Sequence, residues 1–232
     1  MAFVIDAPEP HSLPIMGSDD RFPVRRVYCV GRNYADHARE MGHDPDREPP
    51  FFFMKPSEAV VACPVGSVAS VTYPTQTANL HHEIELAVAI GTQAAEVTPE
   101  QALDAVWGYG VAVDLTRRDM QDDAKALRRP WDLSKGFDES APISALATAA
   151  TIGHPTAGRI TVAVDGVTRQ DGDLNQQIWN VAEVISALSH AITLLPGDII
   201  LTGTPAGVGP VERGETVVGS IDGVGTLGFF VA

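Results

Sequence analysis

The sequence lacks the features of disulfide-bonded, membrane-spanning and nucleic-acid-binding proteins. Cysteine occurs only at Cys29 and Cys63, in no spacing typical of a disulfide framework or a thiolate metal site. No apolar run is long enough to cross a bilayer, and the N-terminus has no basic, signal-like stretch, so we expect a cytoplasmic protein. The 16 basic and 30 acidic residues give a formal charge of −14, which argues against nucleic acid or an anionic membrane as partner. The negative net charge does not exclude an anionic small ligand, because a cation and a few basic groups can invert the electrostatic potential inside a pocket.

Internal repeats and low-complexity segments are also missing, which favours one large domain. The chain has 232 residues, of which 44% are hydrophobic, enough for a sizeable core. Its 21 glycines, 17 prolines and many short apolar runs predict a strand-rich fold. We therefore expect a Pro-rich N-terminal extension over residues 1–23 and a single domain over residues 24–232.

The most informative stretch is residues 81–91, which places two carboxylates in an apolar strand. Because strand side chains alternate between faces, Glu83 and Glu85 project together on the face opposite to the aliphatic residues. Taken alone, the run fits an edge strand with one solvated face equally well. A third carboxylate, Asp114, ends another apolar run, and three such acids indicate a site for a hard divalent cation with oxygen ligands.

Several elements can be predicted from local signals. Thr98, Pro99 and Gln101 predict a capped helix that extends to about Trp107. The Asp165-Gly166 pair predicts a hairpin turn. The remaining predictions are a strand over 24–30, a short helix over 35–41, a surface loop over 42–50 anchored by a buried strand at 51–54, a helix capped at Asn180, and a strand over 198–201 that ends in a glycine-rich loop over 202–209.

The motifs together resemble the fumarylacetoacetate hydrolase superfamily, specifically its small single-domain acylpyruvate hydrolases. The match covers roughly residues 24–232, and within the group the fumarylpyruvate-cleaving bacterial members are the most similar. It rests on five motifs in the family's order: Gly31-Arg32-Asn33-Tyr34 with His37 and Glu40, His82-Glu83-Ile84-Glu85-Leu86, Asp114 with Arg118 and Gln121, Lys135-Gly136-Phe137-Asp138, and Thr202-Gly203-Thr204-Pro205.

The resemblance implies a fold, a cofactor and an activity. The fold would be a mixed α/β, strand-rich β-roll or distorted barrel with peripheral helices, assembled as a homodimer. One Mg²⁺ or Mn²⁺ ion per subunit would be held by Glu83, Glu85 and Asp114. The activity would be hydrolysis of a carbon–carbon bond in a small anionic 2-oxo acid, an acylpyruvate.

The resemblance also implies roles for the other motif residues. His37, oriented by Glu40, would be the general base, although a solvated helix pair has the same spacing. Lys135 and Gln121 would stabilise a tetrahedral alkoxide, whereas a lone lysine is usually a surface charge. Arg118 and Thr204 would bind the substrate, and Arg32 would be a second anchor for the far carboxylate of a dicarboxylic product. Residues 43–50 would be a lid, with a plain flexible loop as the alternative. The alternative interpretations are an ordinary Gly-Thr-Pro turn for Thr204 and a structural ion pair for Arg32.

Two other functions stay open at this stage. One is a lyase on the same scaffold, which decarboxylates oxaloacetate or a related 2-oxo dioate without an activated water. The other is a metal-binding module without turnover. His37 and Glu40 favour hydrolysis over the lyase. The intact set of His37, Glu40, Glu83, Glu85, Asp114 and Lys135 argues against a module without turnover.

Overall fold

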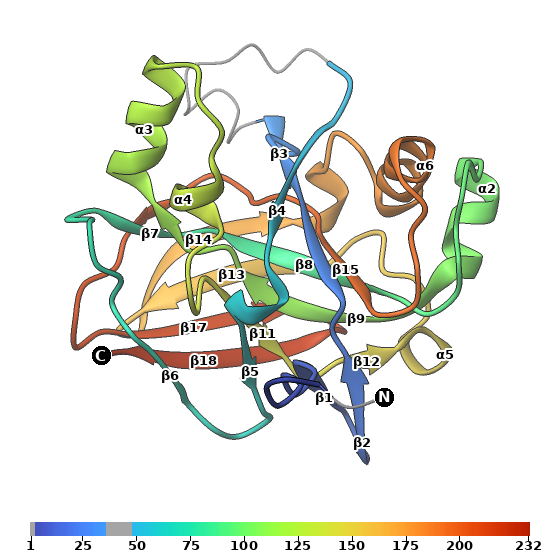
Figure 1. Ribbon diagram of the computed structural model, residues 1–232, viewed down its shortest axis with the longest axis horizontal. Helices are drawn as coiled ribbons and strands as arrows, with labels where there is room; N and C mark the ends of the chain where they lie inside the picture. The colour runs from blue at the N-terminus through green and yellow to red at the C-terminus, as the bar shows by residue number, and fades with distance from the viewer. Residues whose placement is uncertain (1–2, 36–47) are drawn as a thin grey trace.

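Strands dominate the computed structural model, which describes residues 3–35 and 48–232. Curled sheets make up the body of the molecule, and the helices lie at its periphery (Figure 1). The expected strand-rich α/β fold is therefore confirmed. Within the described residues, no helix is both long enough and apolar enough to pass through a membrane.

The largest sheet has eight strands, and the strand that carries Glu85 lies in its middle. This strand, β8 (Ile84–Ile90), is buried along its whole length between β15 and β9, which excludes the edge-strand interpretation. Its aliphatic face packs in the larger core cluster and Ala87 and Ala89 pack in a second one. The spatial order of the strands across the sheet is β4 (Phe51–Lys55), β3 (Arg26–Gly31), β15 (Asp198–Leu201), β8, β9 (Val106–Val113), β11 (Ala141–Ser144) and β5 (Val60–Cys63). The eighth strand, β12 (Ala147–Thr148), pairs with β9.

A five-stranded sheet packs against this one, and the larger core cluster lies between them. Its hairpin turns at Asp165 and Gly166, both with positive φ, as the sequence predicted. In order its strands are β14 (Val167–Asp173), β13 (Arg159–Val164), β17 (Thr216–Ile221), β18 (Gly225–Val231) and β6 (Ala69–Val71). Two small sheets contain β10 (Thr116–Arg117), β7 (Leu80–His82) and β16 (Gly209–Pro210), and β1 (Ser12–Ile15) with β2 (Ser18–Pro23).

The helices are short, and one of them changes type along its length. The capping box of Thr98 and Gln101 forms as predicted, α2 ends at Ala102, and a 3-10 turn continues to Ala105, two residues before Trp107. Val106 pairs with Ile90 in the sheet, so the β ladder overrides the local helix signal. The helix capped at Asn180 forms as predicted. The described helices are α2 (Pro99–Ala102), α3 (Arg118–Ala126), α4 (Asp132–Lys135), α5 (Ala149–Ile152) and α6 (Val181–Ala191), with 3-10 turns η1 (Ser57–Ala59), η2 (Leu103–Ala105) and η3 (Leu174–Gln176).

Strand β4 also differs from its prediction. It lies at the edge of the large sheet with Phe51 and Met54 exposed, and the following Lys55 is the fully buried residue. Apart from Ala35, the predicted helix over 35–41 lies outside the described residues, as does most of the loop over 42–50. Before residue 24, β1 and β2 form a hairpin whose Leu13 and Phe22 pack in the second core cluster. The proposed boundary of the catalytic domain at residue 24 stays a prediction.

Candidate functional site

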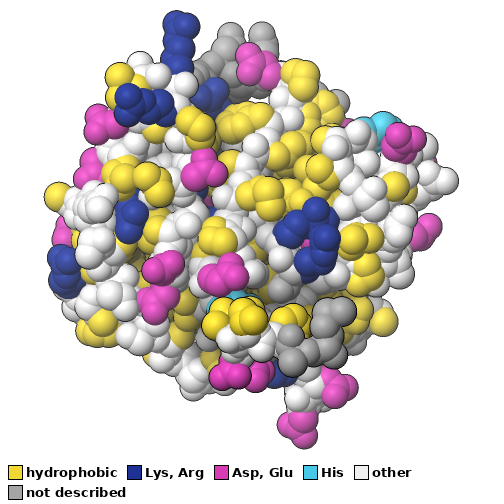
Figure 2. All heavy atoms as spheres, viewed as in Figure 1, with side chains coloured by type: hydrophobic (Ala, Val, Ile, Leu, Met, Phe, Trp, Pro, Cys, Tyr) yellow, Lys and Arg dark blue, Asp and Glu magenta, His cyan; other side chains and the backbone are white. Residues whose placement is uncertain are grey.

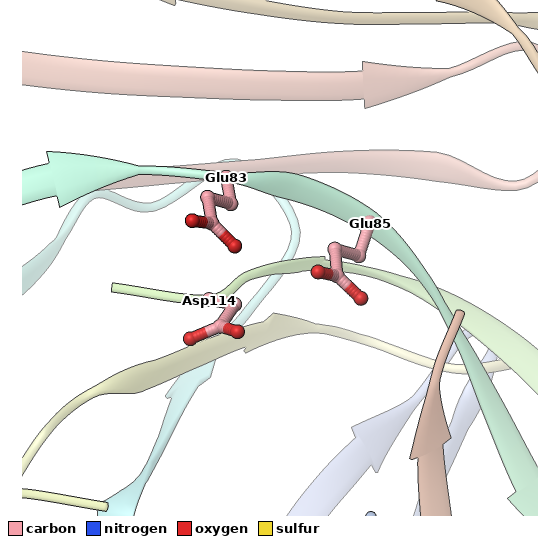
Figure 3. A group of neighbouring side chains, drawn as sticks. All are labelled: Glu83, Glu85 and Asp114. Carbon is pink, nitrogen blue, oxygen red and sulfur yellow. The ribbon is translucent and has the colours of Figure 1, made fainter. Parts of the chain in front are cut away.

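Three carboxylates from two adjacent strands meet in the interior. Glu83 lies between β7 and β8, Glu85 lies in β8, and Asp114 follows β9. The β8–β9 register places Glu83 opposite Asp114, whose N–H donates to the Glu83 carbonyl at 2.8 Å. The side chains point toward one another (Figure 3), and one oxygen from each lies within 4.8 Å of the others. All three are buried, so the structure brings together the residues predicted as metal ligands.

Buried cations partly neutralise this triad. Lys135 Nζ bridges Glu83 Oε2 and Asp114 Oδ2, at 2.7 Å from each. Arg118 pairs with the other oxygen of Glu83. On the opposite side Lys55 Nζ lies 2.8 Å from Asp114 Oδ1. Burial opposes the charge of Lys135, but the carboxylates of Asp114 and Glu83 outweigh it and raise the lysine's pKa.

The donor set fits a hard divalent cation. Burial, together with the charges of Asp114 and Glu83, raises the pKa of Glu85 well above its usual range, so the triad has too little positive charge around it. Asp114 Oδ1 is buried 2.8 Å from Lys55 Nζ, and this one ammonium also donates to the carbonyls of Leu115 and Lys135. Three such carboxylates suit Mg²⁺ or Mn²⁺ and leave part of an octahedral shell for water and ligand oxygens.

The loop after β15 lies against Glu85, and its shape depends on a glycine. Gly203 donates its N–H to Glu85 Oε2 at 2.6 Å and has a φ of +91°. A Cβ at Gly203 would lie 2.6 Å from the Cβ of Asn33, so no larger residue fits. Asn33 is fully buried and donates to the carbonyls of Thr202 and Trp179, at 2.8 Å each. Asn33 therefore holds the loop that carries Thr204.

A second polar network reaches Thr204 from the other sheet. Gln170 of β14 is fully buried, and its Oε1 accepts the N–H of Ile84 at 3.0 Å. Its Nε2 donates to Thr204 Oγ1 at 2.8 Å and to the Pro205 carbonyl at 2.7 Å. Because Oε1 can only accept, His82 must donate from Nδ1 at 2.9 Å. Burial lowers the pKa of His82 and so favours its neutral form. Among the described residues its Nε2 has no hydrogen-bond partner.

Arg118 is held by the protein on several sides. Its guanidinium donates to His81 Nδ1 at 3.3 Å, to Gln121 Oε1 and to Glu83. His81 Nε2 in turn lies 2.8 Å from Asn79 Oδ1, which is consistent with a neutral ring that donates from Nε2. Burial and the charge of Arg118 lower the pKa of His81 to about 4. Arg118 therefore fixes Glu83, and its role in substrate binding stays a prediction.

Most of the predicted residues line one pocket: Arg32, Glu83, Glu85, Arg118, Gln121, Lys135 and Thr204. Asp114 is fully buried beside Glu83 and does not line this pocket, and His37 and Glu40 lie outside the described residues. Sequence reasoning missed Asn33, Lys55, Lys125 and Gln170. Asn33 lies in a quoted motif and Lys55 directly follows an apolar run, so these two had a signal. The pocket wall consists of Val30, Gly31, Arg32, Phe53, Glu83, Glu85, Arg118, Gln121, Lys125, Trp131, Lys135, Gly203 and Thr204.

The chain is similar to proteins of known family along nearly its whole length. Residues 26–232 match the family model described as fumarylacetoacetate (FAA) hydrolase C-terminal. The chain is 43% identical over 207 residues to a mitochondrial oxaloacetate tautomerase of Bos taurus, covering 89% of this chain and 91% of that protein. It is 40% identical over 202 residues to the mitochondrial oxaloacetate decarboxylase of Dictyostelium discoideum, covering 87% and 91%. A solved structure of fumarylpyruvate hydrolase from Pseudomonas aeruginosa, in complex with Mn²⁺ and pyruvate, has a TM-score of 0.98 at 54% identity and covers 100% of this chain and 99% of that one.

Proposed function

Because the chain belongs to the fumarylacetoacetate hydrolase family, as its motifs predicted, we propose that it hydrolyses the carbon–carbon bond of an acylpyruvate. The proposed substrate is fumarylpyruvate and the products are fumarate and pyruvate, as in the breakdown of aromatic compounds through gentisate. The observation that carries the proposal is the 54% identity to a fumarylpyruvate hydrolase that binds Mn²⁺ and pyruvate. The buried triad supports it, because its oxygen ligands fit the same cation.

In this proposal the triad holds the metal and its neighbours keep the triad in place. Glu83, Glu85 and Asp114 would bind one Mg²⁺ or Mn²⁺ ion, which when bound would polarise the 2-oxo group and stabilise the negative charge of the departing pyruvate. Arg118 and Lys135 orient Glu83 by pairing with its two oxygens.

Other side chains would bind the substrate and stabilise the transition state. Thr204 accepts a hydrogen bond from Gln170, so its own hydroxyl hydrogen can be donated to a substrate carboxylate. Gln121 uses its oxygen for Arg118, which leaves its amide nitrogen as a donor to the alkoxide. Lys135 is the second proposed donor to the alkoxide. His37, oriented by Glu40, is proposed from the sequence as the base that takes a proton from water.

The relatives favour a second candidate function. The oxaloacetate tautomerase and decarboxylase are 43% and 40% identical to this chain, and both are named for a 2-oxo dioate. The same metal site and pocket could act on oxaloacetate without an activated water. Both relatives are named as mitochondrial, so the cytoplasmic location expected here stays a prediction, as does the homodimer.

One assay separates the two functions. Purified protein is supplied with Mn²⁺ or Mg²⁺, and loss of the enol absorbance of fumarylpyruvate is followed with identification of the products; oxaloacetate is tested in parallel. We expect fumarate and pyruvate from the wild-type protein and no cleavage by a His37→Ala variant. Turnover of oxaloacetate that persists in His37→Ala, with fumarylpyruvate untouched, would replace the hydrolase by the second candidate.

A further inference from the structure

The lysines of this chain all lie at the candidate site. Lysine occurs only at positions 55, 125 and 135, and arginine supplies the other cationic side chains. Lys55 and Lys135 are buried against Asp114. Lys125 lies on the wall of the same pocket, with a quarter of its side chain exposed. Two of the three lysines thus have a role at the triad, and Lys125 has none there.

Lys125 lies at the end of a row of polar residues on α3. Arg118, Gln121 and Lys125 are spaced by three and four residues, so they share one face of the helix, and all three line the pocket. Seven helical residues rise roughly 10 Å. The row therefore begins at Arg118, which contacts Glu83, and ends about two helical turns farther along α3 at Lys125.

The positive charge of Lys125 is poorly compensated by the described residues. Its Nζ lies 3.5 Å from Asp122 Oδ1, but that side chain is 60% exposed, so the pair is weak. The Trp131 ring centre lies 5.7 Å away. Burial and the nearby charge of Arg118 lower the pKa of Lys125. A lysine in these surroundings is stabilised by an anion that enters the pocket.

The pocket as a whole differs in charge from the protein that contains it. The chain carries a formal charge of −14, and acidic side chains are scattered over the face shown in Figure 2. The pocket wall has Arg32, Arg118, Lys125 and Lys135 against two carboxylates, Glu83 and Glu85. A divalent cation would add further positive charge. Such a pocket favours a ligand with more than one negative group.

We propose that Lys125 binds the distal carboxylate of a dicarboxylic acylpyruvate and thereby determines substrate specificity. The 2-oxo acid end of the ligand lies at the triad, and the acyl chain passes Phe53 and Trp131, which also line the pocket. A planar unsaturated chain ending in a carboxylate suits these surroundings, whereas a chain ending in a methyl group leaves Lys125 without an anion. This inference rests on the proposed function.

The test compares fumarylpyruvate with crotonylpyruvate, in which a methyl group replaces the distal carboxylate. For Lys125→Met we expect kcat/KM for fumarylpyruvate to fall about tenfold, mainly through KM, because a charge-assisted hydrogen bond is lost. The value for crotonylpyruvate should stay within about twofold. Lys125→Arg should retain most of the preference. Arg128→Gln is the matched control, since Arg128 is exposed near the end of α3 and does not line the pocket.

The outcomes separate this inference from the proposed function. An unchanged ratio of the two kcat/KM values in Lys125→Met would overturn the role of Lys125 and leave the hydrolase intact. If the wild-type protein cleaves neither compound, the proposed function fails. In that case the role of Lys125 is tested by calorimetric measurement of fumarate and crotonate binding to the Mn²⁺-loaded protein. A preference for fumarate that Lys125→Met abolishes supports the inference, and equal binding of the two acids to the wild-type protein overturns it.

Discussion

Gln170 donates a hydrogen bond from Nε2 to Thr204 Oγ1 at 2.8 Å, so the threonine oxygen is the acceptor in this contact and the hydroxyl hydrogen points elsewhere. The orientation of the Gln170 amide is unambiguous, because its oxygen accepts a backbone N–H from Ile84 and its nitrogen donates to the Pro205 carbonyl. The Thr204 oxygen is therefore an acceptor for Gln170, and its hydrogen can point into the pocket. Gln170 acts as a positioning residue in this arrangement, since it does not line the pocket itself.

The first prediction concerns this pair. Gln170→Leu should raise KM for the 2-oxo acid about tenfold, because Thr204 loses its fixed orientation. The variant should also lose about 1–3 kcal/mol of unfolding free energy, since the N–H of Ile84 is left unsatisfied. Steady-state kinetics at saturating Mn²⁺ and urea denaturation measure the two effects.

A double-mutant cycle tests whether the kinetic effect passes through Thr204. In a Thr204→Val background, Gln170→Leu should change KM by less than about threefold, because the hydroxyl that it orients is already absent. Full additivity of the two effects on KM would show that Gln170 acts only on stability.

The second prediction concerns Lys55, which is fully buried beside Asp114. Lys55→Met should lower the unfolding free energy of the metal-free protein by about 3–5 kcal/mol, because it leaves one side of a buried carboxylate uncompensated. Bound Mn²⁺ would supply positive charge at the same carboxylate, so the loss should be smaller in the loaded protein. Denaturation with and without Mn²⁺ measures this difference, and an equal loss in both states would contradict it.

The acidic triad could be predicted from the sequence, but much of its surroundings could not. Glu83, Glu85 and Asp114 interrupt runs that strand periodicity marks as core, and a buried charge needs a partner. The structure confirms that the three side chains meet. Gln170 gave no such signal, because it lies in the mostly exposed β14, where the pairing shifts register opposite Val162 and Ala163. The contact between Gln170 and His82 joins residues 88 positions apart in the chain, which local patterns cannot reveal.

Local signals also failed where the sheet competes with them. The capping box of Thr98 and Gln101 begins a helix, but its last turn is a 3-10 turn that stops at Ala105, where the ladder between Val106 and Ile90 begins. Strand β4 was expected to be buried because its residues are apolar. Its position at the sheet edge exposes Phe51, which contacts Trp131 and Arg32 at the pocket side. Apolar composition alone does not distinguish a core strand from a pocket wall.

The third prediction is a pH dependence of stability from His81. Its pKa is about 4 in the folded protein and about 6.5 in an unfolded chain, because the folded protein buries the ring beside Arg118. Below pH 6.5 the unfolded state binds more protons, so this contribution to stability is fully present above pH 6.5 and is lost as the pH falls toward 4.

The comparison of two variants isolates this effect from that of the carboxylates. Between about pH 6.5 and pH 4, His81→Asn should lose less unfolding free energy than the wild-type protein. His190→Asn, at an exposed position on α6, should follow the wild-type curve. Parallel curves for His81→Asn and the wild-type protein would show that His81 is not the group responsible.

The fourth prediction concerns two opposite effects of Glu85, on the stability of the metal-free protein and on the affinity for Mn²⁺. Its carboxylate is buried among like charges, which raises its pKa, so in the metal-free protein its ionised form is destabilising. Glu85→Gln keeps an acceptor for the Gly203 N–H and removes that charge. We therefore expect the metal-free variant to be more stable than the metal-free wild-type protein at neutral pH. The same substitution removes one of the three anionic ligands, so it should weaken Mn²⁺ binding by at least about tenfold.

Thermal or chemical denaturation over a Mn²⁺ titration measures both effects in one experiment. A ligand at a hundred times its Kd stabilises the folded state by about 2.7 kcal/mol, so Mn²⁺ that saturates the wild-type protein should stabilise Glu85→Gln much less. The wild-type protein should become the more stable of the two as Mn²⁺ rises. Glu9→Gln, at an exposed position, should respond to Mn²⁺ as the wild-type protein does. Equal stabilisation of Glu85→Gln and the wild-type protein by Mn²⁺ would exclude Glu85 as a ligand, and the triad would then require another explanation for its buried charge.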